Sequence, residues 1–486
     1  MNINLAGLAS APLTAVLIIP ALAAAVLALL PGYWIAARLN VLAAFATLIA
    51  ALSLLLERPP PGAYLFIDDL STVFVVLSTF VGFTTSVFSA SYIGHELEIG
   101  RLTPRYLRFY HAMYQTLMFA MNLGLTANNI GLMWVAIELA TLTTVLMVGI
   151  YRTHEALEAA WKYFILGSVG IALALFGTIL VYMAARPVLG EGQDAMVWTA
   201  LIDKANAFAP DLLNVAFVFL MLGYGTKVGL APLHAWLPDA HAEGPTPISA
   251  VLSGLLLNVA LYALLRFKIL LTANAAAYAP GPLMVTLGLV SLIFAGFMLY
   301  RRRDIKRMFA YSSIEHMGLI TFAFGVGGPL ANFAGLLHMS MHSLTKSAIF
   351  YTVGHISQTK GTQRMSEIRG LTESHPMLGW GLVLGVVAIA GLPPLGIFMS
   401  EFLIVTSTFA RHPLLALLVV FGLLVAFGAL LLRLNEIAFG EPIGKSAPVK
   451  ASYVPLYAHL GLVLAAGIHF PAPLVAWFQT VARLLG

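Results

Sequence analysis

Apolar runs of about 20 residues follow one another along almost the whole chain, separated by short charged or proline- and glycine-rich segments. A helix needs about 20 mostly apolar residues to cross the roughly 30 Å hydrocarbon core of a bilayer. The pattern therefore predicts an all-α integral membrane protein with about 14 transmembrane helices. The fourteen runs lie near residues 10–30, 35–56, 70–92, 108–127, 129–150, 161–183, 211–231, 247–270, 282–300, 305–325, 331–356, 377–410, 413–435 and 456–482.

Composition excludes several other classes of protein. Of the 486 residues, 60% are hydrophobic and 10% are charged, whereas soluble proteins carry about 25% charged residues. A water-soluble enzyme and a disordered chain are excluded, and a dispersed net charge of +5 does not form a nucleic-acid-binding face. Because the chain has no cysteine, we expect no disulfide, zinc–thiolate or iron–sulfur site, and no cofactor.

The polar linkers at 185–211, 357–375 and 434–452 are too short for an extramembrane domain, so residues 1–486 are predicted to form a single polytopic membrane domain. Residues 1–10 carry no positive charge and no evident cleavage site, so the first run is predicted to be a retained span, not a signal peptide.

Lysine and arginine in the loops indicate orientation, since cytoplasmic loops are enriched in both. With both termini outside, the cytoplasmic side carries 17 of these cations and the outer side 7, and Lys227 and Lys346 lie inside apolar runs. The cytoplasmic set is Arg38, Arg101, Arg105, Arg108, Arg152, Lys162, Arg301, Arg302, Arg303, Lys306, Arg307, Lys360, Arg364, Arg369, Arg433, Lys445 and Lys450; the outer set is Arg58, Arg186, Lys204, Arg266, Lys268, Arg411 and Arg483.

Four ionisable residues stand inside apolar runs, where each costs at least about 2.5–3.5 kcal/mol and is a functional candidate by default. They are Glu138, Lys227, Lys346 and Glu401. Structural ion pairing is the alternative interpretation. If Glu138 approaches Lys227 in one state and leaves it in another, the pair can act as a proton switch, with Lys162 either a second partner or an interface lysine.

Two of the charged runs are interrupted by helix breakers. Gly229, Pro232 and Pro238 follow Lys227, and the segment GLPPLG at 391–396 precedes Glu401. Broken helices at matching points indicate inverted repeats. The prediction is broken helices 7 and 12 and two inverted five-helix repeats, spans 4–8 and 9–13. The resulting parts are 1–107 with helices 1–3, 108–270 as the first repeat, 282–435 as the second, and 456–482 as the last helix.

His338, His342 and Lys346 are spaced four residues apart, so they share one helical face with about 6 Å between successive residues. Histidine titrates near neutrality, and one water fits each gap, so the row is predicted to relay protons. A packing pair is the alternative. The spacing of two histidines also occurs in zinc sites, but no third ligand is evident, and no metal site is predicted.

His234 and His241 flank Asp239 beside the seventh-span break, where they either gate proton entry or cap the broken helix. His316 is a weaker relay candidate, and the neighbouring Glu315 is expected on a helix face packed against protein.

Several segments together resemble the proton-translocating, antiporter-like membrane subunits of respiratory complex I, a family that includes Mrp antiporters and the membrane arm of group 4 [NiFe] hydrogenases. The resemblance covers nearly the whole chain. Residues 155–177 and SSIEHMG look most like the hydrogenase-4 component F branch. The segments are TKVGLAPLHAWLPDAHAEGPTPISAVLSG at 226–254, DIKRMFAYSSIEHMGLI at 304–320, HMSMHSLTKSAIF at 338–350, GLPPLGIFMSEF at 391–402 and 68–96.

The resemblance implies a fourteen-helix fold and assigns proton-translocation roles residue by residue. Its key positions match Glu138 in span 5, Lys227 in span 7, the span-11 row of His338, His342 and Lys346, and Glu401 in span 12. One departure is Asn258, where many relatives have lysine or histidine. A neutral amide orients water but holds no proton, which places the link between the two halves in doubt.

The function implied is a non-catalytic, proton-translocating subunit of a redox complex in a bacterial or archaeal cytoplasmic membrane, with Na⁺ as an alternative coupling ion. Expected partners are other membrane-arm subunits and a soluble hydrogenase, formate dehydrogenase or NADH dehydrogenase-like arm. Two alternatives stay open: a stand-alone or Mrp-like cation/proton antiporter, and a membrane scaffold with structural ion pairs.

Overall fold

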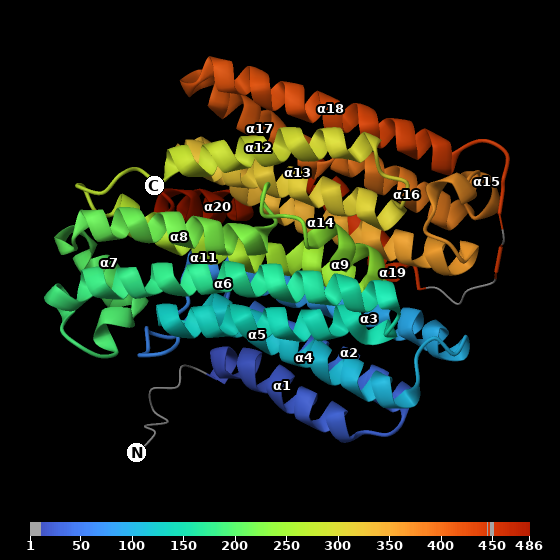
Figure 1. The fold of residues 1–486 in the computed structure, drawn as a ribbon, viewed down its shortest axis with the longest axis horizontal. Helices are drawn as coiled ribbons and strands as arrows, with labels where there is room; N and C mark the ends of the chain where they lie inside the picture. Colours follow the sequence, from blue (N-terminus) through green and yellow to red (C-terminus); the bar gives the residue numbers. More distant parts are fainter. Residues whose placement is uncertain (1–10, 445, 448–451) are drawn as a thin grey trace.

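The computed structural model describes residues 11–444, 446–447 and 452–486, which form a bundle of long, roughly parallel helices (Figure 1). No β-strand occurs in these ranges beyond isolated bridges. The helices are α1 (Ala11–Leu29), α2 (Tyr33–Ser53), α3 (Asp69–Glu98), α4 (Pro104–Thr126), α5 (Ile130–Val148), α6 (His154–Leu189), α7 (Trp198–Lys204), α8 (Pro210–Val228), α9 (Leu237–Glu243), α10 (Thr246–Val251), α11 (Leu257–Thr272), α12 (Gly281–Tyr300), α13 (Ile305–Val326), α14 (Gly328–Lys360), α15 (Leu371–Ser374), α16 (Pro376–Ile389), α17 (Gly396–Arg411), α18 (Pro413–Ala438), α19 (Val454–Ile468) and α20 (Ala472–Leu484).

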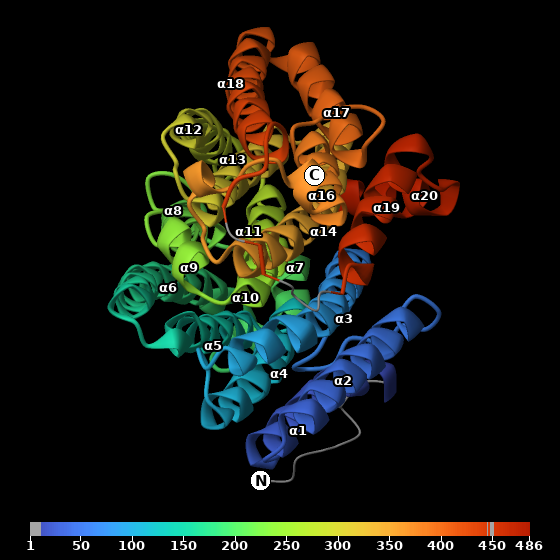
Figure 2. The ribbon, with the colours of Figure 1, turned by 90° about the vertical axis from the view of Figure 1, so that its right-hand side faces the viewer.

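Helix α14 is the centre of the bundle. It packs against α3, α10, α13, α16, α17, α19 and α20, and nearly all of its residues are buried. Viewed along the helices, α1 and α2 lie at one edge of the molecule and α17 and α18 at the opposite edge (Figure 2). The polar residues of α14 are therefore enclosed by other helices.

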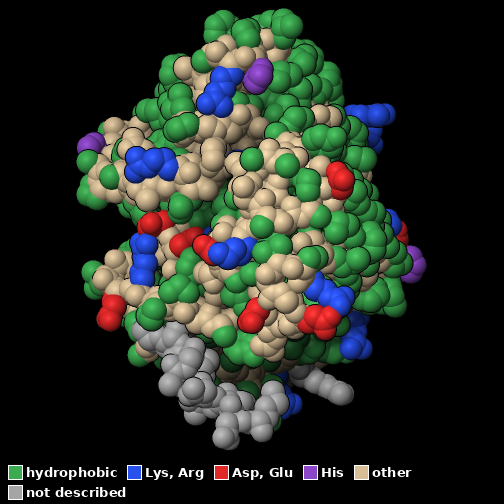
Figure 3. All heavy atoms as spheres, turned by 90° about the vertical axis from the view of Figure 1, so that its left-hand side faces the viewer, with side chains coloured by type: hydrophobic (Ala, Val, Ile, Leu, Met, Phe, Trp, Pro, Cys, Tyr) green, Lys and Arg blue, Asp and Glu red, His purple; other side chains and the backbone are tan. Residues whose placement is uncertain are grey.

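The outer helices are apolar on their exposed faces. Leu42 on α2, Trp161 on α6 and Leu424 on α18 each expose more than 60% of their surface. Figure 3 looks onto the end of the bundle at which α7 lies, where charged side chains gather, while hydrophobic side chains cover the flank on its right. This distribution matches a protein whose sides face lipid and whose ends face water.

Within the described ranges, nine helices are long and apolar enough to cross a membrane, and the bent pair α19 and α20 gives a tenth. The predicted count of 14 is not confirmed. Predicted spans such as 305–325 and 331–356 do form long helices, α13 and α14, but these contain many polar residues. The prediction of one continuous last helix at 456–482 is wrong, since α19 and α20 meet at 85°. Pro471 lies at this bend and interrupts the helical hydrogen bonding.

Both predicted helix interruptions are present. α8 ends at Val228, where Gly229 adopts a left-handed conformation with φ of +81° that suits a residue without a Cβ. The chain resumes as the short α9 and α10. In the second case α16 ends at Ile389, Gly391 has φ of +68°, and α17 begins at Gly396. Each break lies within a few residues of an ionisable side chain, the buried Lys227 in the first case and the partly buried Glu401 in the second.

Four cations assigned to loops or span ends from the sequence are buried: Arg266, Lys268, Lys306 and Lys360. The lysines donate to backbone carbonyls, Lys268 to Leu485 at 2.6 Å and Lys360 to Ile443 at 3.0 Å. Burial of these side chains reflects structural roles that the loop charge count could not reveal. The predictions for residues 1–10, and the charges of Lys445 and Lys450, lie outside the described residues.

An ion pair between Asp68 and Arg266 joins α3 to α11. Asp68 caps α3 by accepting from the Ser71 backbone N–H at 2.8 Å, and Arg266 donates two hydrogen bonds of 2.7 Å to its carboxylate. Burial raises the pKa of the Asp68 carboxyl, but the charge of Arg266 and these hydrogen bonds outweigh burial, and the pKa lies below its ordinary value.

We predict that Asp68→Asn lowers the free energy of unfolding by about 2–3 kcal/mol, because it leaves the buried Arg266 charge unpaired. Thermal unfolding in detergent measures the loss. Since the folded pKa is depressed, the stability from this pair is fully present above the ordinary value near 3.9 and is lost as the pH falls below it. Asp68→Asn should therefore remove that part of the acid sensitivity.

The matched control is Asp203→Asn, since Asp203 pairs with Lys204 at 3.0 Å and its side chain is 70% exposed. This change should cost under about 1 kcal/mol. Equal losses in the two variants would contradict a structural role for the Asp68–Arg266 pair.

Candidate functional site

Lys227 lies in the last turn of α8, immediately before the break, and its side chain is 2% exposed. Its Nζ is 3.7 Å from Oε2 of Glu138 on α5 and donates a 2.8 Å hydrogen bond to Oγ1 of Thr141, one turn further along. The structure thus brings together Glu138 and Lys227, whose proximity the sequence analysis left open. Oε2 of Glu138 is buried and accepts no hydrogen bond, so charge attraction alone holds it to Lys227.

Small residues on α6 make room for the Lys227 side chain. A Cβ added to Gly167 would lie 2.9 Å from Lys227 Nζ, and one added to Gly223 on α8 would lie 2.6 Å from the Gly170 carbonyl oxygen. The α6 and α8 backbones therefore approach closely along their glycines. This close packing confines the lysine to the side of α5.

Lys162 does not reach this pair. Its Nζ lies 2.6 Å from Glu158 and 3.1 Å from Asp239, and its side chain is 48% exposed. Arg307 of α13 also pairs with Asp239. The interpretation of Lys162 as a second partner of the buried pair is wrong, and Lys162 is an interface lysine.

The histidines at the first break have apolar surroundings. His234 packs against Phe294 with ring centroids 4.9 Å apart, and His241 stacks on Phe350 at 4.8 Å. Neither ring nitrogen of His241 has a hydrogen-bond partner, so its ring does not cap the broken helix. Lys306 does, because its Nζ donates to the carbonyls of Ala242 at 3.1 Å and Gly244 at 2.6 Å.

The row on α14 is completely buried. His338, His342 and Lys346 are each 0% exposed, and Nζ of Lys346 donates to the Phe309 carbonyl on α13 at 2.9 Å. His316 of α13 joins the row, since its Nδ1 lies 2.9 Å from Nε2 of His338. The other nitrogen of His338 is 2.9 Å from Oγ of Ser400 on α17. Three helices therefore meet at His338.

His342 has no hydrogen-bond partner for either ring nitrogen, although its ring centroid is 5.5 Å from that of His316. A buried imidazole without partners is costly in a structural network. Its position between His338 and Lys346 fits a group that exchanges protons with both through intervening water.

Asn258 links α11 to this row. It follows a π-helical turn at Leu252–Leu256, and its Nδ2 donates to the Gly254 carbonyl at 3.0 Å and to Oγ of Ser343 at 2.5 Å. Ser343 is adjacent to His342. Among the described residues no hydrogen bond joins Asn258 to Lys227. The Lys227–Glu138 pair and the α14 row with His316 are therefore two separate clusters in this conformation.

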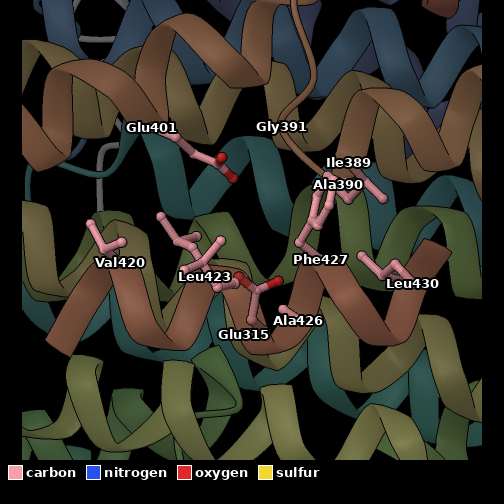
Figure 4. A pocket seen from close by; sticks show the side chains of 11 residues that line it. Glu315, Ile389, Ala390, Gly391, Glu401, Val420, Leu423, Ala426, Phe427 and Leu430 are labelled. Atoms are coloured by element: carbon pink, nitrogen blue, oxygen red, sulfur yellow. The ribbon is translucent and has the colours of Figure 1, made fainter. Parts of the chain in front are cut away.

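Glu401 lies in the second turn of α17, just after the second break. It borders a cavity of about 260 Å³ whose other walls include Glu315, the break residues Ile389, Ala390 and Gly391, and apolar side chains of α18 (Figure 4). Gly391 packs directly against the Glu401 carboxylate. As expected, Glu315 lies on a helix face buried against protein, since it is 1% exposed, and its side chain also borders this cavity.

Donor atoms of His316, His338 and Glu401 all lie within 4.8 Å of one another, a group that does not include His342 of the zinc-spaced pair. The two imidazoles are within hydrogen-bond distance of each other, and the second nitrogen of His338 is within reach of Ser400. With both nitrogens of His338 engaged, the arrangement favours proton exchange over metal coordination.

The sequence analysis missed the contributions of Thr141, Ser400 and Glu315 and understated that of His316. A signal for Glu315 was present, since it is a carboxylate inside an apolar run, as Glu138 is. The hydroxyl residues give no comparable signal, because serine and threonine are frequent throughout these helices.

The family described as NADH:quinone oxidoreductase/Mrp antiporter, transmembrane, matches residues 127–427. The chain belongs to this family. It is therefore a multi-pass integral membrane protein of the respiratory-complex type. The match includes Glu138, Lys227, the α14 row and Glu401, so the two buried clusters both fall within the family's shared region.

Comparison with individual relatives supports the same family assignment. The chain is 61% identical to a hydrogenase-4 component F homolog of Methylacidiphilum infernorum, over 97% of this chain and 99% of that protein. It is 31% identical to NADH-quinone oxidoreductase subunit N of Desulforudis audaxviator, over 81% and 78%. The fold matches a chain of a membrane-bound sulfane sulfur reductase, an archaeal respiratory membrane complex, with a TM-score of 0.86, 23% identity and 97% coverage of both chains.

We predict that Gly391→Ala moves the Glu401 carboxylate, because the added Cβ would overlap it. Left-handed φ costs a residue with a Cβ about 1–2 kcal/mol, so stability also falls. Gly361→Ala is the matched control, since Gly361 has φ of +67° and nothing within 4 Å of its added Cβ. Both variants should lose similar stability in thermal unfolding. Structures of both should show Glu401 displaced only in Gly391→Ala; an unmoved Glu401 there would contradict the packing described.

Proposed function

We propose that this chain is a non-catalytic, proton-translocating membrane subunit of a respiratory-type redox complex of the hydrogenase-4, formate hydrogenlyase or NADH-quinone oxidoreductase class. The observation that carries this proposal is the ion pair of the buried Lys227, at a helix break, with the partly buried Glu138. An ion pair in a rigid helix would only hold the bundle together. At a break, the chain can move one partner relative to the other.

The energy scale fits such a role. Two unit charges about 4 Å apart interact by about 4 kcal/mol at an effective dielectric constant of 20. Moving one charge through 100 mV of membrane potential requires about 2.3 kcal/mol. Separating Lys227 from Glu138 therefore changes the hold of the lysine on its proton by an energy of the size that coupled transport needs.

The second cluster supplies the remainder of the proposed path. Lys346, His342, His338 and His316 lie on two adjoining helices, and donor atoms of His316 and His338 lie within 4.8 Å of Glu401, which borders the cavity. Asn258 adjoins this cluster through its hydrogen bond to Ser343, and in the proposed path it orients water without carrying the proton itself. Glu138, Lys227, His234, Asn258, His338, His342, Lys346 and Glu401 are the proposed translocation residues, with His234 at the entry beside the first break.

The partners are proposed from the relatives' names, which include a hydrogenase-4 component and an NADH-quinone oxidoreductase subunit. We place the chain beside other membrane-arm subunits and a soluble redox arm, with both termini outside, as the loop charges indicate. With no cysteine in the sequence, electron transfer through thiolate-bound clusters belongs to other chains. The two five-helix repeats, 108–270 and 282–435, are part of the same proposal.

One observation disfavours a scaffold whose charges are purely structural. Nζ of Lys227 lies 3.7 Å from the Glu138 carboxylate, whereas the structural pair of Asp68 and Arg266 is joined by two hydrogen bonds of 2.7 Å. An Mrp-like antiporter working without a redox arm is the alternative function. The family description includes such antiporters, and transport driven by a sodium gradient alone in vesicles would favour that alternative.

We predict that Lys227→Ala abolishes proton translocation in sealed vesicles while the complex still assembles, because Glu138 then has no cationic partner that exchanges a proton. Fluorescence of a pH-sensitive dye measures translocation, and native gels measure assembly. Lys204→Ala is the control, since Lys204 is 55% exposed on α7 and should leave translocation unchanged. Translocation at the unaltered rate in Lys227→Ala would overturn the proposed function.

We also predict that Asn258→His increases the rate of proton translocation, because the imidazole places a titratable group beside Ser343 where the amide only orients water. The same dye assay measures the rate. Ser343→Ala provides the comparison, since it removes the 2.5 Å hydrogen bond to Asn258 without adding a titratable group, and should slow translocation. A slower or unchanged rate in Asn258→His would show that a missing titratable group does not limit the relay.

A further inference from the structure

Glu315 is a buried carboxyl group to which the proposed path assigns no role. It lies on α13, is 1% exposed and has no described ion pair with a lysine or arginine. Figure 4 shows its carboxylate and that of Glu401 on opposite sides of the cavity, both directed toward its interior. Two carboxyl groups from different helices thus face one apolar space.

The cavity has room for water and polar groups at both ends. Its volume is about 260 Å³, while a water molecule occupies about 30 Å³ in the liquid. The side walls are apolar, since α18 contributes Val420, Leu423, Leu424, Ala426, Phe427 and Leu430. Water there can form hydrogen bonds with the two carboxyl groups and with the backbone at the break.

Glu315 also borders the histidine pair. Its Oε2 is 3.1 Å from Nε2 of His316, at an angle that gives no hydrogen bond, and both atoms otherwise lack partners. The other nitrogen of His316 lies 2.9 Å from His338. Glu315 is therefore placed between the imidazole pair and the cavity. At this distance, a change in the orientation of the Glu315 carboxylate or of the His316 ring is enough to form a hydrogen bond between them.

We propose that Glu315 carries the translocated proton between His316 and Glu401 across this cavity, an inference that rests on the proposed function. In one direction of transport, the Nε2–H bond of a protonated His316 breaks as an O–H bond forms on the Glu315 carboxylate, leaving a neutral imidazole and a neutral acid. The acid then gives its proton to a cavity water, which passes one to the Glu401 carboxylate. Glu315 returns to its ionised form, and the reverse direction uses the same bonds.

The pairing of two carboxyl groups has a physical reason. Two negative charges facing the same apolar space repel each other and are poorly solvated, so the pair favours holding one shared proton. The charged or titratable groups around Glu315 are His316 on its own helix, Lys346 on α14, and Glu401 on α17 across the cavity. The ring of His316 in turn packs against those of His338 and His342 on α14. The residues of α18 that line the cavity are all apolar, so this helix adds no charged or titratable group.

The test uses Glu315→Gln in the intact membrane complex. This change keeps the side-chain volume but removes the proton-carrying group, and translocation should fall by about tenfold or more. Glu315→Asp retains a carboxyl group and should recover part of the rate, which a purely structural role does not require. Glu373→Gln, an exposed glutamate on α15, is the matched control and should leave the rate unchanged. Unaltered translocation in Glu315→Gln would overturn the inference.

Infrared spectroscopy of the purified complex gives a second readout, independent of transport. The carbonyl band of protonated carboxylic acids should contain a component that shifts in D₂O and changes in both Glu315→Gln and Glu401→Gln, but not in Glu373→Gln. A band unaffected by Glu315→Gln would contradict the shared proton. If the Glu315→Gln complex does not assemble, the spectra of Glu315→Asp and Glu401→Gln test the shared proton instead, and a band unchanged in both variants would contradict it. If Lys227→Ala abolishes translocation while Glu315→Gln does not, the inference alone fails; if neither matters, the proposed function fails.

Discussion

The cost of placing charge inside an apolar helix bundle governs the arrangement of this protein. Each buried cation or acid has to be compensated, and the structure does so in two distinct ways. Arg266, Lys268 and Lys306 are satisfied by a carboxylate or by backbone carbonyls near helix ends, and they hold helices together. Lys227, by contrast, donates its hydrogen bond to Thr141, while Oε2 of its carboxylate partner Glu138 lies 3.7 Å away, which is a looser ion pair.

The helix breaks give the loosely held groups their freedom. α8 stops one residue after Lys227, and α17 starts five residues before Glu401, so each group lies beside backbone outside a continuous helical ladder. α14 remains unbroken between them and carries His338, His342 and Lys346 on its buried face. In the proposed function, α14 supplies the fixed proton-exchanging groups and the two helix breaks supply the sites that move.

Much of this arrangement could be predicted from the sequence because it depends on local spacing. The breaks follow from proline and glycine, and the α14 row follows from residues four apart on one helix. Contacts between distant helices were not accessible in the same way. The meeting of His316 with His338 joins α13 to α14, and the cavity between Glu315 and Glu401 depends on how α18 packs against the second break. The 85° bend between α19 and α20 was missed because the apolar run was given more weight than Pro471, the helix breaker at the bend.

The central claim is that buried charge pairing is used for transport and not only for stability. Its most direct measurement is the number of protons moved per electron pair in sealed vesicles of the complex carrying Glu138→Gln. The account predicts that electron transfer continues while this ratio falls below that of the unaltered complex. An unchanged ratio at an equal rate of electron transfer would contradict it.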